Sequence, residues 1–247
     1  MSASQNKLSI SPDGESFPLP EQADYAAEYQ RVKALAEAAR AKGQEVVVVM
    51  GVGFVGAVMA AIVADCTDRD GRPSKFVIGC QRPSTRSFWK IPLLNRGVSP
   101  VKAEDPQVDV LIGRCVNDRK TLTATYNSQV IDLADCVVID VQCDFLKQEL
   151  GNMKSGECDM AALEATLKTV GQHIRPECLV LIETTVAPGT TEFVAWPILK
   201  KAFANRGITS VPLLAHSYER VMPGREYVAS IRDFWRVCAG CDAAARA

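Results

Sequence analysis

The longest apolar run of the chain covers residues 45–64, and its composition changes half-way along. Residues 46–49 are consecutive valines, and β-branched side chains favour an extended strand. The part that follows Gly56 is rich in alanine, which favours a helix. The pattern therefore predicts a buried strand that is followed directly by a helix.

Three glycines stand at this junction with the spacing G-x-G-x-x-G: Gly51, Gly53 and Gly56. In a dinucleotide-binding turn the first permits the tight turn, the second lets the backbone approach a pyrophosphate, and the third lets the helix pack closely. The free N–H groups of the new helix, which starts at Phe54 and Val55, then point at the phosphates. A membrane span is the alternative, because about 19 uncharged residues is close to bilayer length. The mid-way change in propensity and the lack of an aromatic belt disfavour it.

Short apolar runs alternate with amphipathic stretches along the rest of the chain. This alternation predicts an α/β protein with a Rossmann-like, doubly wound, mostly parallel sheet, spanning residues 45–247. Residues 1–44 form a separate extension, with a polar, loosely ordered arm over residues 1–20 and a helix over residues 23–42. We expect further strands at residues 75–80, 122–125, 136–141, 178–183 and 210–215, and helical segments at residues 83–95, 105–116, 129–134, 160–174 and 190–204.

Composition narrows the classes of protein. The 247 residues, 47% apolar and 23% charged, suit one large globular domain or one domain with extensions. The net charge of −1 gives no indication of a nucleic-acid or membrane-surface partner. Nine cysteines without a signal peptide indicate free thiols in a reducing cytoplasm. The single C-x-x-C, at Cys238 and Cys241, lacks the second pair that a zinc site needs, so we expect no metal.

The second strand of the predicted sheet ends at Gln81, where dinucleotide-binding folds usually carry an acid for the ribose hydroxyls. A neutral amide still hydrogen-bonds a diol. Arg82 and Arg86, which follow, could instead accept a 2′-phosphate or be solvated loop charges. We expect NAD as the cofactor, with NADP as the second choice.

Polar side chains follow the later strands, whose carboxyl ends share one edge of a parallel sheet. Thr184 and Thr185 follow the fifth strand, and Glu219 and Arg220 follow the sixth. A carboxylate beside a guanidinium suits polar substrate recognition or water activation, and a plain surface ion pair is the alternative.

The fourth strand runs into Val141 and Cys143, which should face the cofactor. Cys143 lacks an evident activating partner, because His173 and His216 are the only histidines of the chain. We therefore favour packing or cofactor contact over a nucleophilic role for this thiol.

Taken together, the motifs resemble the NAD-binding domain of the UDP-glucose/GDP-mannose dehydrogenase family over residues 45–241. The resemblance rests on GVGFVG at residues 51–56, ETTVAPGTT at residues 183–191 and ERVMPG at residues 219–224. A weaker match is VQCD at residues 141–144, where the family usually shows a Val-Pro-Thr-Pro-like turn.

This resemblance implies an enzyme that oxidises the C6 alcohol of a nucleotide sugar twice, using two NAD⁺ for each uronate. It implies that Gly51, Gly53 and Gly56 hold the pyrophosphate, that Cys143 and Thr184 border the nicotinamide, and that Lys90 lies near the adenosine ribose. It further implies that Thr185 positions the catalytic water and that Glu219, Arg220 and Gly224 meet the substrate. The Glu-Arg-x-x-Pro-Gly form is similar to members that act on UDP-N-acetylhexosamines, although Tyr218 and Pro223 depart from the UDP-glucose version.

The family's nucleophilic cysteine belongs to a central helical domain, and a nucleotide-sugar domain follows it; neither matches this chain. We therefore expect a fragment, split subunit or truncated product that is inactive alone, with either a homo-oligomer or a separate catalytic subunit as its partner. A non-catalytic NAD-binding or regulatory module and a related β-hydroxyacid-type dehydrogenase fragment are the alternatives.

Overall fold

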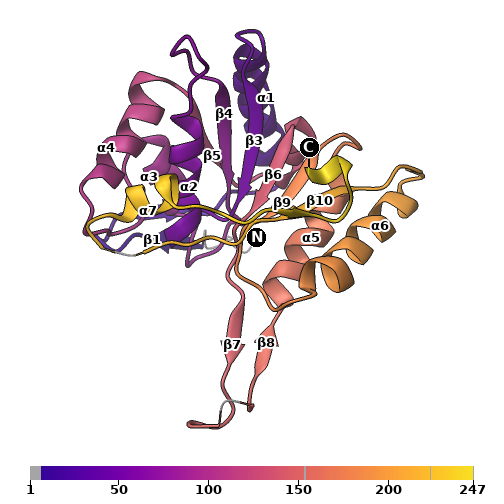
Figure 1. Ribbon diagram of the computed structural model, residues 1–247. Coiled ribbons are helices and arrows are strands. Elements are labelled where there is room, and N and C mark those ends of the chain that lie inside the picture. Colours follow the sequence, from indigo (N-terminus) through magenta and orange to yellow (C-terminus); the bar gives the residue numbers. More distant parts are fainter. Residues whose placement is uncertain (1–6, 153, 223, 247) are drawn as a thin grey trace, which may run out of the picture.

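The computed structural model describes residues 7–152, 154–222 and 224–246. A seven-stranded sheet in the order β11-β10-β9-β6-β3-β4-β5 forms its centre (Figure 1). Every neighbouring pair is parallel except β10 and β11, so the predicted Rossmann-like α/β fold is confirmed. The strands are β3 (Glu45–Met50), β4 (Lys75–Cys80), β5 (Leu122–Thr125), β6 (Cys136–Ile139), β9 (Leu179–Ile182), β10 (Leu213–His216) and β11 (Ala239–Gly240).

Chain order along the sheet reverses between β3 and β6, because the chain moves outward through β4 and β5 and then returns to the other side of β3. Parallel α/β sheets bind their ligands at such a switch point, outside the carboxyl ends of the strands. The glycine turn after β3 and the VQCD stretch after β6 therefore lie next to each other at this switch point.

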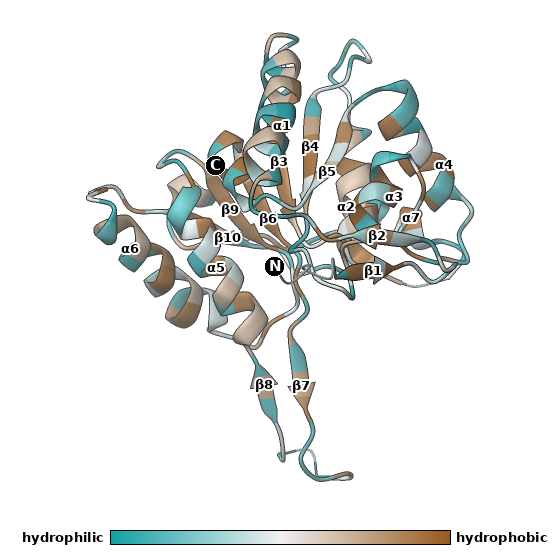
Figure 2. Ribbon diagram, turned by 180° about the vertical axis from the view of Figure 1, so that it is seen from behind, coloured by the Kyte–Doolittle hydropathy of each residue, from teal (hydrophilic) through white to brown (hydrophobic). Residues whose placement is uncertain are grey.

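Helices cover both faces of the sheet, and the central strands are correspondingly apolar (Figures 1 and 2). Val46 and Val48 belong to one buried cluster, whereas Val47 and Val49 belong to the other. A strand that is buried on both faces needs apolar residues at every position. One cluster receives α1 (Asp24–Arg40), α5 (Ala161–His173) and α6 (Trp196–Asn205), and the other receives α2 (Phe54–Ala64), α3 (Lys90–Asn95), α4 (Gln107–Gly113) and α7 (Tyr227–Asp233).

Helix α1, which precedes the first strand of the sheet, completes the fold. The crossover from β5 to β6 contains only the 3₁₀-helix Ser128–Leu133, which is too short to cover the sheet. The apolar stripe of α1, Val32, Ala36 and Ala39, is buried against the strands in its place. The predicted helical extension is therefore an integral part of the sheet's cover.

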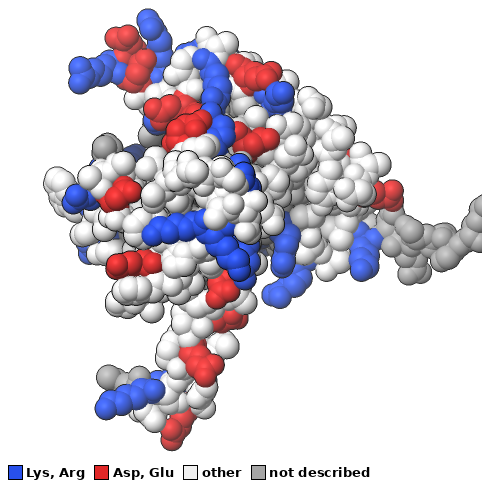
Figure 3. All heavy atoms as spheres, turned by 90° about the vertical axis from the view of Figure 1, so that its right-hand side faces the viewer, with Lys and Arg blue, Asp and Glu red and all other residues white. Residues whose placement is uncertain are grey.

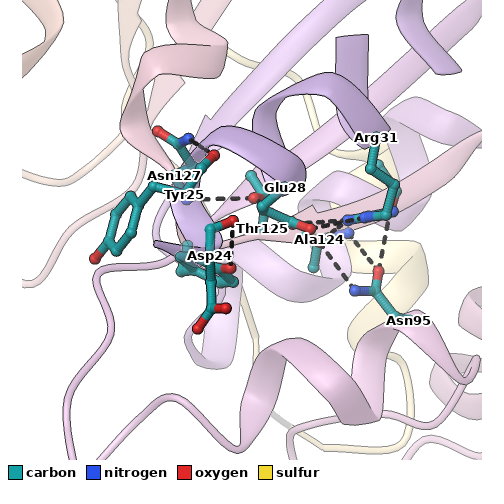
Figure 4. Close-up of polar contacts among 10 residues, drawn as sticks. Asp24, Tyr25, Glu28, Arg31, Asn95, Ala124, Thr125 and Asn127 are labelled. Atoms are coloured by element: carbon teal, nitrogen blue, oxygen red, sulfur yellow. Dashed lines mark hydrogen bonds and ion pairs between the residues drawn. The ribbon is translucent and has the colours of Figure 1, made fainter. Parts of the chain in front are cut away.

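Polar contacts align α1 with the edge strand β5 (Figure 4). The Arg31 guanidinium donates to Thr123 Oγ1 at 3.2 Å and to the Ala124 carbonyl at 3.1 Å. Glu28 pairs with Arg31 and accepts a hydrogen bond from Thr125 Oγ1 at 2.6 Å. Polar groups of the edge strand β5 are thus occupied by side chains of α1, and this cover disfavours pairing of β5 with another chain.

Truncating the buried stripe of α1 should destabilise the protein. We expect Val32→Ala, at a fully buried position, to lower the free energy of unfolding by about 2 kcal/mol, because methyl groups leave the core and a cavity remains. Urea denaturation followed by circular dichroism measures this. The adjacent Lys33→Ala, at a half-exposed position, is the control and should change stability by less than about 0.5 kcal/mol. Equal effects of the two substitutions would contradict the packing of α1 on the sheet.

The prediction of a loosely ordered arm is wrong for residues 7–20, and its first six residues lie outside the described part. β1 (Leu8–Ile10) and β2 (Ser16–Pro18) form an antiparallel hairpin. Ser9 is fully buried and its hydroxyl accepts a hydrogen bond from the Trp89 N–H at 3.1 Å. Strands of three residues are too short to show a hydrophobic period, so only their tertiary contacts reveal them.

A second hairpin was also missed. β7 (Asp144–Leu146) and β8 (Glu157–Asp159) pair in an antiparallel ribbon that projects from the body of the molecule (Figure 1). Phe145 and Leu146 are exposed on it. Acidic and basic side chains are interspersed over this ribbon and the adjoining face (Figure 3), in keeping with the near-neutral net charge.

Some predicted helices are shorter or less regular than expected. The segment predicted over residues 83–95 is helical only from Lys90, while those over residues 105–116 and 190–204 contain π-helical stretches at Arg114–Asp118 and Thr191–Ala195. Helix α7 and strand β11 were not predicted. None of the helices in the described ranges is long and apolar enough to cross a membrane.

Candidate functional site: a cleft at the switch point

A cleft of about 750 Å³ opens at the carboxyl ends of β3, β4 and β6. Its walls come from the glycine turn, the segment after β4, the residues after β6 and one side of α5. Its lining includes Gly51, Gly53, Gln81, Arg82, Ser84, Arg86, Ser87, Lys90, Asp140, Val141 and Gln142. Most of the residues that the sequence assigned to the cofactor are therefore brought together in one place.

The three glycines have different physical roles. Gly51 has φ +102°, a backbone conformation that L side chains rarely adopt, and a Cβ there would overlap the Asp140 carbonyl. A Cβ on Gly56 would overlap the Gly51 carbonyl. A Cβ on Gly53, in contrast, meets no atom within 4 Å. Gly51 and Gly56 are therefore required by the fold, while Gly53 leaves space open beside the cleft.

Helix α2 begins at this turn with Phe54 and Val55, and no side chain caps its N-terminus. Its first N–H groups are thus available to an external acceptor, and the helix dipole favours an anion there. Phe54 itself stacks on Tyr227 of α7, with ring centroids 4.8 Å apart. The aromatic ring therefore packs on protein, and the backbone N–H is the part of Phe54 that remains available at the helix N-terminus.

Gln81 supports the glycine turn. Its Oε1 accepts a hydrogen bond from the Val52 N–H at 3.1 Å, and its Nε2 lies 3.3 Å from Ser87 Oγ. A side-chain acceptor at the end of β4 thus holds the turn in place. A carboxylate could make the same contact to Val52, and the neutral amide of Gln81 does so without adding negative charge to the cleft.

Three cations line the part of the cleft that follows β4: Arg82, Arg86 and Lys90. Within residues 7–152, 154–222 and 224–246, none of the three forms an ion pair with a carboxylate. Burial lowers the pKa of Lys90. These cations are positioned to neutralise phosphate groups.

The sequence analysis missed an aromatic pair at the rim of the cleft. Tyr25, in the first turn of α1, and Tyr126, after β5, line the cleft with their ring centroids 5.1 Å apart in an edge-to-face arrangement. Asn127 holds this corner, because its Nδ2 donates to the Tyr25 carbonyl at 2.8 Å (Figure 4). No local signal marks Tyr25, since α1 reaches the cleft only through its packing on β5.

Cys143 lies at the base of the β7–β8 hairpin, outside the cleft lining. Its Sγ is 3.5 Å from both Cys158 Sγ and Met160 Sδ. Burial, first, and then the neighbouring Cys158 raise the pKa of the Cys143 thiol to about 11. A thiol that is protonated at neutral pH is a poor nucleophile. This environment suits packing, which is one of the two roles that we favoured for Cys143, while cofactor contact stays a prediction.

The predicted catalytic pair does come together. Thr185 Oγ1 lies 3.5 Å from Glu219 Oε1, although the two residues follow different strands. Glu219 is oriented by its other oxygen, which accepts the Val221 N–H at 2.7 Å. Thr184, in contrast, turns inward and donates to the Val141 carbonyl at 2.7 Å, so its hydroxyl joins the ends of β6 and β9.

Arg220 and Gly224 lie beyond Glu219 on the loop that leads to α7. Arg220 is exposed, and Gly224 has φ +136° in open surroundings, because a Cβ there would meet no atom within 4 Å. Pro223, on which the comparison with UDP-glucose members depends, lies outside the described residues. Arg220 thus directly follows Glu219 at the surface, and Gly224 has room beside it for a ligand.

A buried ion pair that the sequence did not reveal lies behind this corner. Glu183, which is 2% exposed, pairs with Arg236 from the segment before β11. Burial raises the pKa of Glu183, and the Arg236 guanidinium opposes that rise. The pair ties the end of β9 to the C-terminal segment, a contact across 53 positions that no local motif predicts.

Residues 45–242 match the sequence profile of the UDP-glucose/GDP-mannose dehydrogenase family, NAD binding domain. The chain belongs to this family. The resemblance seen in the motifs is thereby confirmed, and the match argues against the β-hydroxyacid-type alternative.

Three relatives are named as dehydrogenases. GDP-mannose 6-dehydrogenase of Pseudomonas putida is 27% identical over 172 residues, which is 66% of this chain and 35% of that protein. UDP-N-acetyl-D-mannosamine dehydrogenase of Pyrococcus horikoshii is 39% identical over 67 residues, which is 27% of this chain and 16% of that protein. The crystal structure of NDP-N-acetyl-D-galactosaminuronic acid dehydrogenase from Methanosarcina mazei aligns with TM-score 0.71 and 33% identity, covering 85% of this chain and 42% of that one. This chain therefore matches less than half the length of each of these three relatives.

Proposed function

We propose that this chain binds NAD in the switch-point cleft as the cofactor-binding part of a nucleotide-sugar 6-dehydrogenase. The observation that carries the proposal is the space beside Gly53, where a Cβ meets nothing, next to an uncapped helix N-terminus. In this arrangement the pyrophosphate lies against Gly53 and the N–H groups of Phe54 and Val55. The adenosine end extends toward Gln81, Arg82 and Lys90, and the nicotinamide end toward Val141, Cys143 and Thr184.

The substrate side of the proposal rests on Thr185 and Glu219. Glu219 Oε1 and Thr185 Oγ1 can share a water molecule, which is the arrangement needed to hydrolyse an acyl intermediate. Arg220 and Gly224 then meet the nucleotide sugar. The names of the Pyrococcus horikoshii and Methanosarcina mazei relatives support an N-acetylated sugar, so we propose a UDP-N-acetylhexosamine as substrate.

We propose that the complete reaction also needs the nucleophilic thiol and the sugar-binding region that the family carries outside the matched domain. Burial raises the pKa of six of the chain's own thiols, which makes them poor nucleophiles: Cys80, Cys115, Cys136, Cys143, Cys178 and Cys241. A non-catalytic NAD-binding module is the second candidate, and the amide at Gln81 favours it.

Joining residues 1–242, which keep α1 on the sheet, to the remainder of the Methanosarcina mazei relative separates the two candidates. The enzyme is supported if the fusion forms NADH from a UDP-N-acetylhexosamine and if Thr185→Ala and Glu219→Gln both lower the rate of NADH formation. A folded, NAD-binding, inactive fusion supports the module.

Titration calorimetry tests the cofactor. We expect NADH to bind more tightly than NADPH, because the Gln81 amide can hydrogen-bond a ribose diol. Arg82, Arg86 and Lys90, which line the same part of the cleft, are the residues that a 2′-phosphate would use instead. The variant Arg82→Ala should then weaken both dinucleotides by a similar factor. If NADPH binds more tightly and Arg82→Ala removes that preference, the arginine reads a 2′-phosphate and the cofactor is NADP. Absence of binding by both dinucleotides would refute the cofactor-domain proposal.

A further inference from the structure

Asp140 is the residue of the cleft whose chemistry the proposed function does not use. It follows β6 at the switch point, and its backbone carbonyl abuts Gly51. Its side chain reaches beneath the first turn of α2, because a Cβ placed on Gly56 would lie 3.1 Å from Asp140 Oδ2. Among the described residues, this buried oxygen has no hydrogen-bond partner. The carboxyl group therefore lies close to the helix N-terminus where the pyrophosphate of a dinucleotide would bind.

The charged groups around Asp140 come from four other segments. Glu183 at the end of β9 and Glu219 after β10 are both negative, and Arg236 before β11 is positive but already pairs with Glu183. Tyr227 of α7 is the remaining titratable neighbour, and its pKa is raised by burial, first, and then by Asp140 and Glu219. The local balance is thus negative, with one arginine shared among three carboxyl groups.

Burial, first, and then Glu183 and Glu219 raise the pKa of Asp140 to about 7, while Arg236 opposes the rise. At neutral pH the side chain therefore exchanges between its acid and its carboxylate. Adding a pyrophosphate dianion to the same corner penalises the carboxylate further, because two anions then compete for one helix N-terminus.

We propose that Asp140 takes up a proton from solvent when the pyrophosphate of a dinucleotide binds to the glycine turn. The proton forms an O–H bond on the carboxylate, so the site neutralises one of its own charges when it accepts the ligand. This inference rests on the proposed cofactor site. Proton uptake by Asp140 makes dinucleotide binding tighter at low pH than at high pH. The group that takes up the proton contacts the glycine turn, and it contacts neither the sugar nor the nicotinamide.

Two measurements on the unaltered chain test the uptake. Titration of NADH in Pipes and in Tris, buffers with different ionisation enthalpies and no phosphate to compete for the site, gives the number of protons bound. We expect about half a proton at pH 7.5 and a Kd about sixfold weaker at pH 8.5 than at pH 6.5, as for a group whose pKa rises from about 7 to about 8 on binding. The uptake should also decrease toward zero both at pH 5.5 and at pH 9.5, because the group is then in the same state before and after binding.

The variant Asp140→Asn identifies the group. The amide keeps the size of the side chain and cannot take up the proton, so proton uptake should vanish and the Kd should be equal at pH 6.5 and pH 8.5. His216, whose Nε2 lies 3.4 Å from the Thr184 carbonyl, is the histidine at the same edge of the sheet and is therefore tested as an alternative. The control variants His216→Gln and Asp109→Asn, the latter exposed on α4, should retain the uptake of the parent chain.

The outcomes separate this inference from the proposed function. NADH binding with no proton uptake, or with uptake that survives in Asp140→Asn, overturns the inference and leaves the cofactor site intact. Uptake that is lost in His216→Gln assigns the proton to the histidine and likewise overturns it. Failure of the folded chain to bind NADH at any pH between 5.5 and 9.5 refutes the cofactor site itself, and the inference with it.

Discussion

Replacement of Gly53 by aspartate should abolish dinucleotide binding without unfolding the protein. A Cβ on Gly53 meets no atom within 4 Å, so the chain accommodates the new side chain. The added carboxylate occupies the space proposed for the pyrophosphate and repels it. We expect the Kd for NADH to weaken by at least about 100-fold, or about 2.8 kcal/mol. Calorimetry measures the binding, and thermal unfolding followed by circular dichroism verifies the fold.

Two control variants distinguish occlusion from a general effect of charge. Val211→Asp adds the same charge at an exposed position before β10, and it should leave NADH binding unchanged. Gly53→Ala adds only a methyl group and should have an intermediate effect. If Gly53→Asp binds NADH like the parent chain, the space beside Gly53 is not where the pyrophosphate lies, and the cofactor proposal loses its main support.

Replacement of Gly56 by alanine should instead destabilise the fold. The new methyl group would overlap the backbone carbonyl of Gly51, and it would also approach Asp140 Oδ2 at 3.1 Å. A backbone atom cannot rotate away as a side chain can, so α2 must move from the sheet or the turn must open. We expect the free energy of unfolding to fall by about 3 kcal/mol or more, at the upper end of what overpacking costs.

Urea denaturation measures the effect of Gly56→Ala, and Gly53→Ala is its matched control. Both substitutions add one methyl group to the same turn and remove one glycine from the unfolded chain. Gly53 is the N-cap of α2 and Gly56 lies inside the helix, so helix propensity alone would favour alanine at position 56 by about 1 kcal/mol. A lower stability of Gly56→Ala than of Gly53→Ala therefore reports the cost of the contact. Equal midpoints for the two variants would show that Gly56 does not bring α2 close to the sheet.

The elements around the glycine turn could be read directly from the chain. Four valines, a G-x-G-x-x-G spacing and an alanine-rich segment act through local backbone preferences, and the structure has β3 and α2 where they were expected. The alternation of strands and helices also predicted the sheet. The hairpins β1–β2 and β7–β8 were missed, because three-residue strands have no detectable period and depend on their partners for stability.

The candidate site was recovered in part. Thr185 and Glu219 were expected at one edge of the sheet, because parallel strands end on the same side, and they do approach each other. Tyr25 was missed, because it reaches the cleft only through the packing of α1. The importance of Asp140 was missed as well, since an unpaired carboxyl group is recognised from what surrounds it in space and not from its neighbours in the chain.

The chain alone determined the family, the fold class and the position of the glycine turn, because these depend on backbone preferences and on periodic burial. Only the tertiary structure showed that α1 replaces a missing crossover helix, that Arg236 neutralises Glu183, and that Asp140 is left without a partner among the residues that the structure describes. These features depend on contacts between segments far apart in sequence. The pKa of a buried carboxyl group is set by the sum of such contacts and by its loss of water, neither of which any single stretch of residues contains.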